Sequence, residues 1–448
     1  MSAARLLLPA LRFPVDRGAA LRLAQRGVAG FCVFWPDETL QVLLGELQAA
    51  APHPLLIAAD LENGAGQHLP GATRHPPAAA LDPASARAAG MLTAWEGRAR
   101  GVTMVFAPVC DVCSDPRNPI INLRAFADPA RAAPEFVAGA HAGGLRACAK
   151  HFPGHGATTV DSHVALPVAD ASREVWRDRD APAFAACFKG GVDAVMSAHV
   201  AWPALTRDPT LPATLSRHVM TDLLRGDLGF QGLAVSDALL MESVLGGRSE
   251  GEAARAAIEA GCDLVIGPRD TAGVLDALEN VPAKRLEEAC ARIESAATPL
   301  ARADISPIPL RVRLRGAAGV SIESWGEWPL APGEHPLRIC DLHGDGRRFQ
   351  EGLSVAHEVV APDGNVLARG GERGLGAPAL LMARADRAWG AGLEPPPAVA
   401  ALLGQSAFLI ALGPRSLVPP GAHLRGWIRA PGEDPYTLEA VSRRAFPR

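Results

Sequence analysis

The segment with the most chemically active side chains is residues 150–163, KHFPGHGATTVDSH. Within it, Asp161 and His163 are two positions apart, so in an extended segment their side chains point the same way. A carboxylate beside an imidazole fixes the tautomer and favours the imidazolium, which makes His163 a proton donor usable near neutral pH. The alternative is that Asp161 only caps a turn together with Ser162. The pattern favours acid–base chemistry.

A metal site is the competing interpretation of the same segment, because His151, His155 and His163 are ligand types. However, the Pro-Gly pair at 153–154 interrupts any helix between the first two histidines, so two ligands one turn apart are not available. The Lys150 ammonium would also repel a cation. We therefore expect no metal and no cofactor.

A second candidate is Asp237 in the segment GLAVSDALLM, residues 232–241, where an apolar run ends in one carboxylate. The next acidic residue is Glu242, so Asp237 is the only carboxylate at this position. A lone aspartate after a strand is either a helix cap or a catalytic group, and the residues alone leave both readings open.

Short apolar runs alternate with helical patterns over the first 300 residues or so, a usual length for a (β/α)8 barrel. Near-continuous apolar strands are typical of a parallel sheet buried on both faces. We expect a TIM-like (β/α)8 barrel, with a doubly wound open sheet as the alternative. The predicted strands are 5–8, 28–34, 55–59, 102–107, 146–149, 194–197, 233–235 and 263–266. The predicted helices are 17–26, 38–50, 83–100, 129–142, 173–189, 216–227, 249–260, 271–278 and 284–297.

Polar residues follow five of these strands. They therefore lie at the C-terminal ends of the strands, which is the end of a barrel that carries the chemistry. Helix capping could explain an aspartate there, but not a lysine followed by a histidine. The residues are Asp60, Asp111, Lys150 with His151, His199 and Asp237.

The rest of the chain has a different character. We expect the barrel to occupy residues 1–302, a polar, proline-rich linker residues 303–309, and a smaller α/β domain residues 310–448. Strands are predicted there at 337–342, 379–383 and 407–412. No chemical motif falls in this domain, so a structural or dimer-forming role is the simplest interpretation.

Composition limits the functional classes. With 48% hydrophobic and 21% charged residues, the chain reads as a folded protein, and a net charge of −4 without a basic run argues against nucleic acid as a partner. No apolar run could span a membrane, and the apolar stretch near the N-terminus is too short for a signal peptide, so we expect a cytoplasmic protein. The eight cysteines are scattered in apolar runs, as reduced thiols are, and the Cys110–Cys113 pair lacks the context of a zinc or redox site.

Taken together, four segments resemble glycoside hydrolase family 3, and within it the β-N-acetylglucosaminidase branch. They are LLIAADLENGAGQHLPG (55–71), FAPVCDVCSDPRNPIINLRAF (106–126), KHFPGHG followed by DSH (150–163), and residues 198–241. The third is highly specific, and the others occur in the family's order. The resemblance covers most of the first 300 residues or so and implies a barrel and a retaining mechanism.

The resemblance also implies roles, position by position. Asp237 matches the nucleophile, and His163 with Asp161 matches the branch's acid/base dyad. His199 is expected to line the pocket. The positions that match sugar-binding residues are Asp60, Arg124, Lys150 and His151.

The expected substrate is a small-molecule glycoside with a terminal β-linked N-acetylglucosamine, and peptidoglycan fragments are among the substrates the family implies. Two departures concern sugar specificity: His68 stands where many members have arginine, and Asn122 and Leu123 precede Arg124. The alternatives are a β-glycoside phosphorylase, because a neutral histidine does not repel phosphate, and a non-catalytic sugar-binding protein.

Overall fold

The computed structural model describes residues 2–115, 118–301, 303 and 306–320, and seven strands beyond them. The chain divides into two units. The first, the barrel unit, comprises Met1–Arg74, Asp82–Ser114 and Asp128–Arg311. The second unit comprises His75–Leu81, Asp115–Ala127 and Val312–Arg448.

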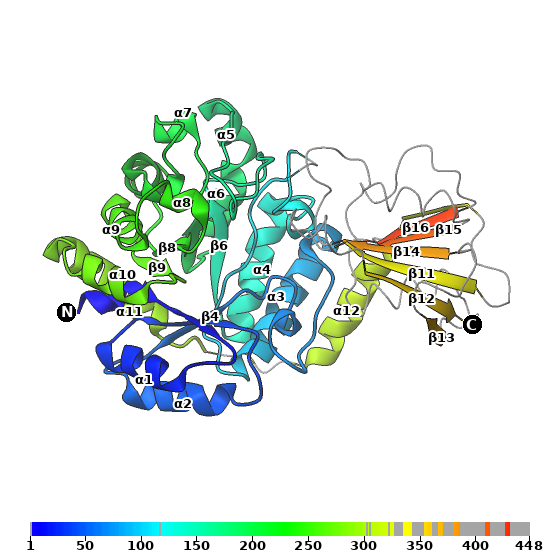
Figure 1. Ribbon diagram of the computed structural model, residues 1–448. Coiled ribbons are helices and arrows are strands. Elements are labelled where there is room, and N and C mark those ends of the chain that lie inside the picture. The colour runs from blue at the N-terminus through cyan, green and yellow to red at the C-terminus, as the bar shows by residue number, and fades with distance from the viewer. Residues whose placement is uncertain are drawn as a thin grey trace. The chain divides into compact units, whose positions relative to one another are not determined.

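The core of the barrel unit is a parallel sheet of nine strands in the order β1-β9-β8-β7-β6-β5-β4-β3-β2 (Figure 1). β1 and β2 stand at opposite ends of this order but are separated in the chain only by Pro9, which has no N–H to donate. Leu7 pairs with Val265 of the last strand and Ala10 pairs with Cys32 of β3, so residues 7–12 join the two ends of the sheet. The predicted barrel is confirmed. The strands are β1 (Leu7–Leu8), β2 (Ala10–Arg12), β3 (Gly30–Phe34), β4 (Leu56–Ala59), β5 (Met104–Val105), β6 (Arg146–Phe152), β7 (Ala194–Ser197), β8 (Leu233–Ala238) and β9 (Leu264–Ile266).

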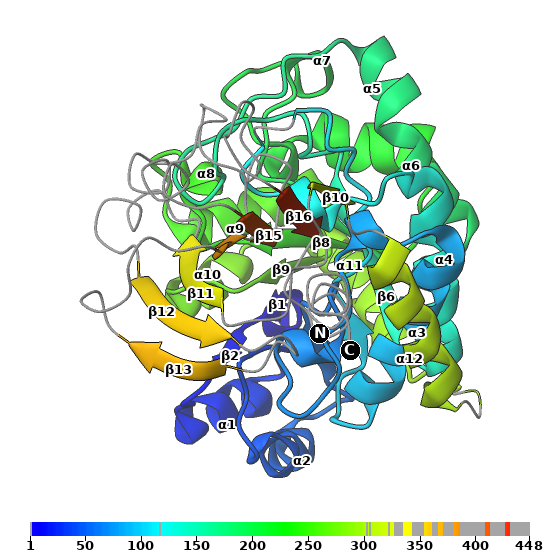
Figure 2. The same ribbon diagram turned by 90° about the vertical axis from the view of Figure 1, so that its right-hand side faces the viewer.

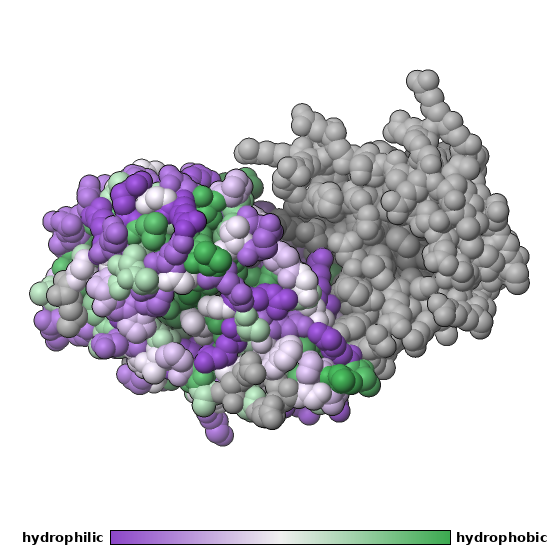
Figure 3. Space-filling model, turned by 90° about the horizontal axis from the view of Figure 1, so that it is seen from below, coloured by the Kyte–Doolittle hydropathy of each residue, from purple (hydrophilic) through white to green (hydrophobic). Residues whose placement is uncertain are grey.

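Helices surround this sheet, and six of them begin at a side chain that accepts a hydrogen bond from the first turn. Such caps are Asp16, Asp82, Asp128, Ser172, Ser249 and Asp270. The face of the barrel unit that Figure 3 shows is mostly hydrophilic, with apolar patches between the polar residues. The helices are α1 (Arg17–Arg26), α2 (Leu40–Ala50), α3 (Pro83–Arg98), α4 (Pro129–Gly143), α5 (Arg173–Arg179), α6 (Ala181–Lys189), α7 (Pro203–Thr206), the π-helix η6 (His218–Asp227), α8 (Glu242–Leu245), α9 (Glu250–Ala260), α10 (Thr271–Leu278) and α11 (Ala283–Ala297). The 3-10 helices are η1 (Ala3–Leu6), η2 (Ala65–Gln67), η3 (Ala78–Ala80), η4 (Asn122–Arg124) and η5 (Ala213–Leu215).

Two predicted elements were wrong in part. The first predicted strand, 5–8, begins as the 3-10 helix η1, and the strand starts only at Leu7. The predicted helix 173–189 is two helices, because Pro182 can occupy the first turn of a helix but not its interior.

Two aspartates, one buried and one largely buried, form ion pairs at the opposite end of the barrel, where the strands begin. Asp263, directly before β9, contacts Arg225 at 2.7 Å, Arg285 at 2.6 Å and Arg292 at 3.0 Å. Asp193, directly before β7, binds His141 at 2.7 Å and Arg146 at 2.5 Å. Side chains at this end of a barrel serve stability rather than chemistry.

The second unit contains a seven-stranded mixed sheet in the order β10-β16-β15-β14-β11-β12-β13. The three predicted strands are present as β11 (His335–Leu342), β14 (Leu380–Ala385) and β15 (Phe408–Leu412), which pair in parallel. β12 (Ser354–Val360) pairs antiparallel with β11, and β13 (Val366–Gly370) pairs antiparallel with β12 (Figure 2). β10 (Glu323–Gly326) pairs antiparallel with β16 (Gly426–Ala430).

Helix α12 (Pro307–Val320) begins within the predicted linker, with proline at its first position. The boundaries 1–302, 303–309 and 310–448 remain predictions. None of the described helices combines the length and apolar composition needed to cross a bilayer.

Candidate active site

The ends of the barrel strands bring the predicted polar residues to one face. Asp60 follows β4, Lys150 and His151 lie near the end of β6, and His199 follows β7, while Asp237 is near the end of β8. Because neighbouring strands are parallel, these ends meet at the same edge of the ring.

Asp237 is a half-buried carboxylate whose Oδ1 accepts a hydrogen bond from the Ala238 N–H at 2.7 Å. Burial alone would raise the pKa of this carboxyl. Interactions with His199, His151 and Lys150, together with the Ala238 hydrogen bond, more than offset that effect and lower the pKa. Asp237 is therefore ionised at neutral pH, as a nucleophile must be.

Lys150 is a buried ammonium, with only 2% of its side chain exposed. Its Nζ donates to Asp60 Oδ1 at 2.6 Å and lies 3.6 Å from Glu62 Oε2. A buried lysine needs such partners to remain charged. Glu62 was not predicted, although it stands two positions after Asp60 in the same segment.

Asp111 is the fully buried anchor of the histidine loop. Its Oδ2 contacts His151 Nδ1 at 2.7 Å, and its Oδ1 accepts the His155 N–H at 2.6 Å. Burial opposes the charge of Asp111, but His151 and His155 prevail and lower its pKa. Sequence reasoning placed Asp111 at a strand end without giving it this role, since no pattern indicates which loop a buried carboxylate will hold.

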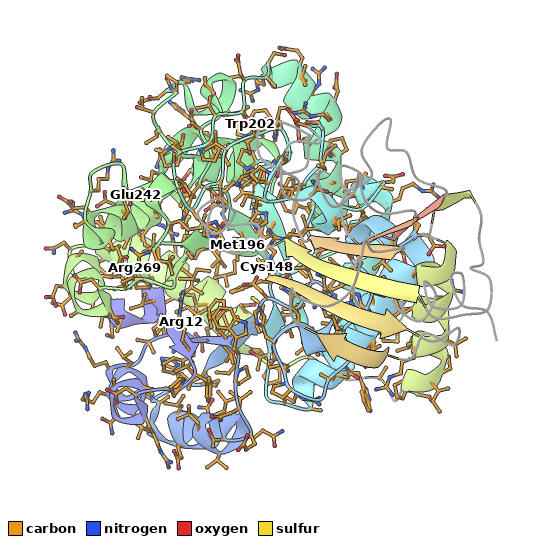
Figure 4. All side chains as sticks on the ribbon, turned by 45° about the vertical axis from the view of Figure 1, so that its right-hand side comes forward. Arg12, Cys148, Met196, Trp202, Glu242 and Arg269 are labelled. Atoms are coloured by element: carbon orange, nitrogen blue, oxygen red, sulfur yellow. The ribbon has the colours of Figure 1, made fainter. Side chains whose placement is uncertain are left out.

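Two indoles fix the middle of the same loop. The Nε1–H of Trp176 donates to the carbonyl of Pro153 at 2.8 Å, and that of Trp202, labelled in Figure 4, donates to the carbonyl of Gly154 at 2.8 Å. A Cβ on Gly156 would lie 1.9 Å from the Val112 carbonyl oxygen, so only glycine fits there. The loop KHFPGHG is thus held by specific contacts on several sides.

The Asp161–His163 pair is formed, with 2.8 Å between Asp161 Oδ1 and His163 Nδ1. The segment is a turn rather than the extended strand expected, because the same Oδ1 also accepts the His163 backbone N–H at 2.8 Å. The Asp161 carboxylate therefore does both: it caps the turn and it orients the imidazole of His163. The side chain of His163 is 53% exposed, and its Nε2 is not the nitrogen used by Asp161.

His155 tethers this turn to the loop. Its Nε2 lies 3.0 Å from the hydroxyl of buried Ser162, and its Nδ1 lies 3.0 Å from the Thr158 hydroxyl. Burial lowers the pKa of His155 to about 4, so the ring is neutral at physiological pH. A neutral imidazole with both nitrogens hydrogen-bonded serves here as a structural brace.

His199 is fully buried and interacts with Asp237. Its Nδ1 contacts the Thr214 hydroxyl at 2.8 Å and its Nε2 contacts the Ala238 carbonyl at 3.2 Å. Burial lowers the pKa of His199, although the charge of Asp237 opposes this. These contacts favour support of the strand that carries Asp237 over direct contact with a sugar.

Arg124 lies on η4 in the second unit, where its Nη1 donates to the Ile120 carbonyl at 3.3 Å. Its contact with a sugar remains a prediction.

Among the residues that the structure describes, no three His, Cys, Asp or Glu side chains are grouped so that they could hold a metal ion. The sulfur of Cys110 lies 3.5 Å from that of Cys187, and both thiols are buried. The partner of Cys110 is therefore not the second cysteine of its C-x-x-C motif.

A cavity of about 410 Å³ lies between α1, the end of β2 and the turn after β9. It is lined by Arg12 and Arg269, both labelled in Figure 4, and by apolar residues such as Leu240. None of the residues predicted for the sugar site lines it.

Comparison with known proteins supplies the family. Residues 16–303 match the model described as "Glycosyl hydrolase family 3 N terminal domain". A protein named beta-hexosaminidase from Idiomarina loihiensis is 36% identical over 287 residues, which cover 60% of this chain and 84% of that protein. A Cellulomonas fimi protein named beta-N-acetylglucosaminidase/beta-glucosidase is 35% identical over 298 residues, covering 61% of this chain and 52% of that one.

Solved structures agree. A family 3 β-N-acetylglucosaminidase from Paenibacillus sp. superposes with a TM-score of 0.79 at 25% identity, covering 98% of this chain and 95% of that one. NagZ from Neisseria gonorrhoeae, in complex with N-trifluoroacetyl-D-glucosamine, gives a TM-score of 0.58 at 28% identity, covering 69% and 94%. The chain therefore belongs to glycosyl hydrolase family 3, with the family's N-terminal domain in its barrel unit.

Proposed function

We propose that the protein is a retaining β-N-acetylglucosaminidase that releases terminal β-linked N-acetylglucosamine, with Asp237 as nucleophile and the Asp161–His163 dyad as acid/base. The observation that carries the proposal is an ionised Asp237 at the barrel end that also bears the ion pair of buried Lys150 with half-buried Asp60. The names of the relatives support the substrate class.

In the first step a carboxylate oxygen of Asp237 attacks the anomeric carbon and the bond to the glycosidic oxygen breaks. That oxygen keeps the electron pair and takes a proton from Nε2 of His163. Asp161 holds the opposite nitrogen, which stabilises the charged ring.

In the second step neutral His163 removes a proton from water, whose oxygen attacks the anomeric carbon and releases Asp237. Asp60 and Lys150 would bind sugar hydroxyls, and His151 and Arg124 would donate to ring or acetamido oxygens. Natural substrates are proposed among peptidoglycan fragments and other amino-sugar glycosides.

We also propose a cytoplasmic location. Support comes from the cysteines whose side chains are described, all seven of which are free thiols.

The proposal is tested by release of p-nitrophenol from p-nitrophenyl N-acetyl-β-glucosaminide. The unaltered protein should cleave it, and Asp237→Ala should lose at least about 10³-fold in kcat, because covalent catalysis is removed. Asp276→Ala, which removes an exposed carboxylate from α10, is the matched control and should retain full activity. Full activity of Asp237→Ala would contradict the assignment, and an inactive wild type would favour a sugar-binding protein.

The same assay in phosphate buffer separates hydrolysis from phosphorolysis. Free N-acetylglucosamine is the expected product, whereas N-acetylglucosamine 1-phosphate would identify a phosphorylase.

A further inference from the structure

Three aromatic rings gather where β3 ends, and we call Phe34, Trp35 and His68 the aromatic platform. Their centroids are 5.7 Å apart for Phe34–Trp35, 5.9 Å for Phe34–His68 and 5.5 Å for Trp35–His68. Such tilted and edge-on pairs are favourable ring geometries. The cluster is therefore an ordered surface rather than three unrelated side chains.

Trp35 is the exposed member of the platform, with 60% of its surface accessible. Its φ is +48°, a left-handed conformation that is unusual for a bulky residue. Backbone conformations of this kind persist where the surroundings hold them, and they are frequent at ligand sites. Arg12, labelled in Figure 4, lies over the Phe34 ring with its guanidinium carbon 5.3 Å from the centroid. Trp35 thus remains the ring available to a ligand.

The platform borders the proposed sugar site. β3 and β4 pair in parallel with Cys32 opposite Ala58, so two positions further along Phe34 is level with Asp60. Burial lowers the pKa of His68, and this ring also experiences the charges of Asp60, Glu62 and Lys150. His68 therefore lies close both to Trp35 and to the ion pair expected to hold the cleaved sugar.

The platform is also uncharged near neutral pH. The lowered pKa keeps the His68 ring neutral. Its buried Nδ1 has no hydrogen-bond partner among the described residues, and the imidazole packs edge-on against the two neighbouring rings.

We propose that Trp35, supported by His68, binds the first ring of the leaving group when that group is a sugar. This inference rests on the proposed function, in which Asp60 and Lys150 bind the sugar that is cleaved. A pyranose with equatorial substituents presents an apolar face of C–H groups, and these carry slight positive charge that matches the negative face of an indole. The exposed, neutral platform suits such a face better than a charged group.

The test compares two substrates that differ only in the leaving group, N,N′-diacetylchitobiose and methyl N-acetyl-β-glucosaminide. Trp35→Gly removes the ring and tolerates the positive φ, whereas Trp35→Phe keeps a ring. For Trp35→Gly, kcat/KM on the disaccharide should fall about tenfold, mainly through KM, which corresponds to about 1.4 kcal/mol. On the methyl glycoside it should stay within about twofold, and Trp35→Phe should recover most of the loss.

A binding experiment in the Asp237→Asn background completes the design. Adding Trp35→Gly should weaken binding of the disaccharide but not of N-acetylglucosamine. Val42→Ala, which removes another exposed apolar side chain from α2, should change neither measurement.

If Trp35→Gly loses activity equally on both substrates, or on neither, the proposed role of the aromatic platform is wrong. The proposed hydrolase function would not be affected by either result. If the unaltered protein neither binds nor cleaves the two glycosides, the proposed function fails and the platform fails with it.

Discussion

The charge of Asp237 depends on its neighbours more than on its exposure. Burial raises the pKa of this carboxyl, but interactions with His199, His151 and Lys150 outweigh burial and keep the pKa low. Two of these groups have their own carboxylates, since Lys150 pairs with Asp60 and His151 with Asp111. Asp237 is thus one member of a network of carboxylates and their lysine and histidine partners.

Sequence reasoning identified the ionisable residues of this network but not their supports. Asp237, Lys150 and His151 stand out because a charged side chain directly follows an apolar strand. Glu62 and Thr214 do not stand out, because their roles depend on loops that fold back onto neighbouring strands. Such long-range contacts leave no local pattern.

The dyad leads to a prediction about leaving groups. In His163→Ala, kcat/KM on N,N′-diacetylchitobiose should fall by about 10²–10⁴-fold, because the departing sugar oxygen needs a proton. On the p-nitrophenyl glycoside the loss should be below about tenfold, since p-nitrophenolate leaves without one. His218→Ala, at an exposed histidine of η6, serves as the control. Equal losses on both substrates would show that His163 is not the proton donor.

At the scale of elements, the sequence predicted a helix well wherever a nearby residue in the sequence marks the helix end. Helices α1 and α10 have the predicted bounds because Asp16 and Asp270 cap their first turns. β2 was missed, since Pro9 breaks the apolar run of the first strand and leaves three residues too short to recognise. Closure of the ring decides which sheet edge such a short strand joins. Sequence patterns do not reveal ring closure.

The ion pairs beneath the barrel should matter for stability and not for chemistry. Asp263→Ala leaves Arg225 and Arg285 without their buried carboxylate and should lower the free energy of unfolding by about 3 kcal/mol. Urea denaturation measures this loss, while kcat of the folded fraction should be unchanged.

Asp227→Ala is the matched control, because its pair with Arg173 is more than half exposed. Exposed pairs contribute about 1 kcal/mol or less. A similar effect of both substitutions would contradict a stabilising role for Asp263.

For the whole molecule, acid should destabilise the fold before the ordinary carboxyl range is reached. A histidine in the unfolded chain takes up a proton near pH 6.5, whereas folded His155 does so only at about pH 4. Between these values the unfolded state binds more protons, so stability is lost as the pH falls from about 6.5 to 4.

His155→Gln should therefore show a shallower decline of the free energy of unfolding across this window, measured by urea denaturation at several pH values. His218→Gln should leave the slope unchanged. A slope in His155→Gln identical to that of the unaltered protein would rule out His155 as its source.

Ring closure through residues 7–12 also has a consequence for synthesis on the ribosome. Leu7 emerges early, but its partner Val265 is made only after nearly the whole barrel has been translated. At about 5–20 residues per second, this delay lasts on the order of tens of seconds. Throughout that interval the nascent chain carries an unpaired strand edge. An edge of this kind can pair with another polypeptide, so we expect the risk of aggregation to be highest during this interval.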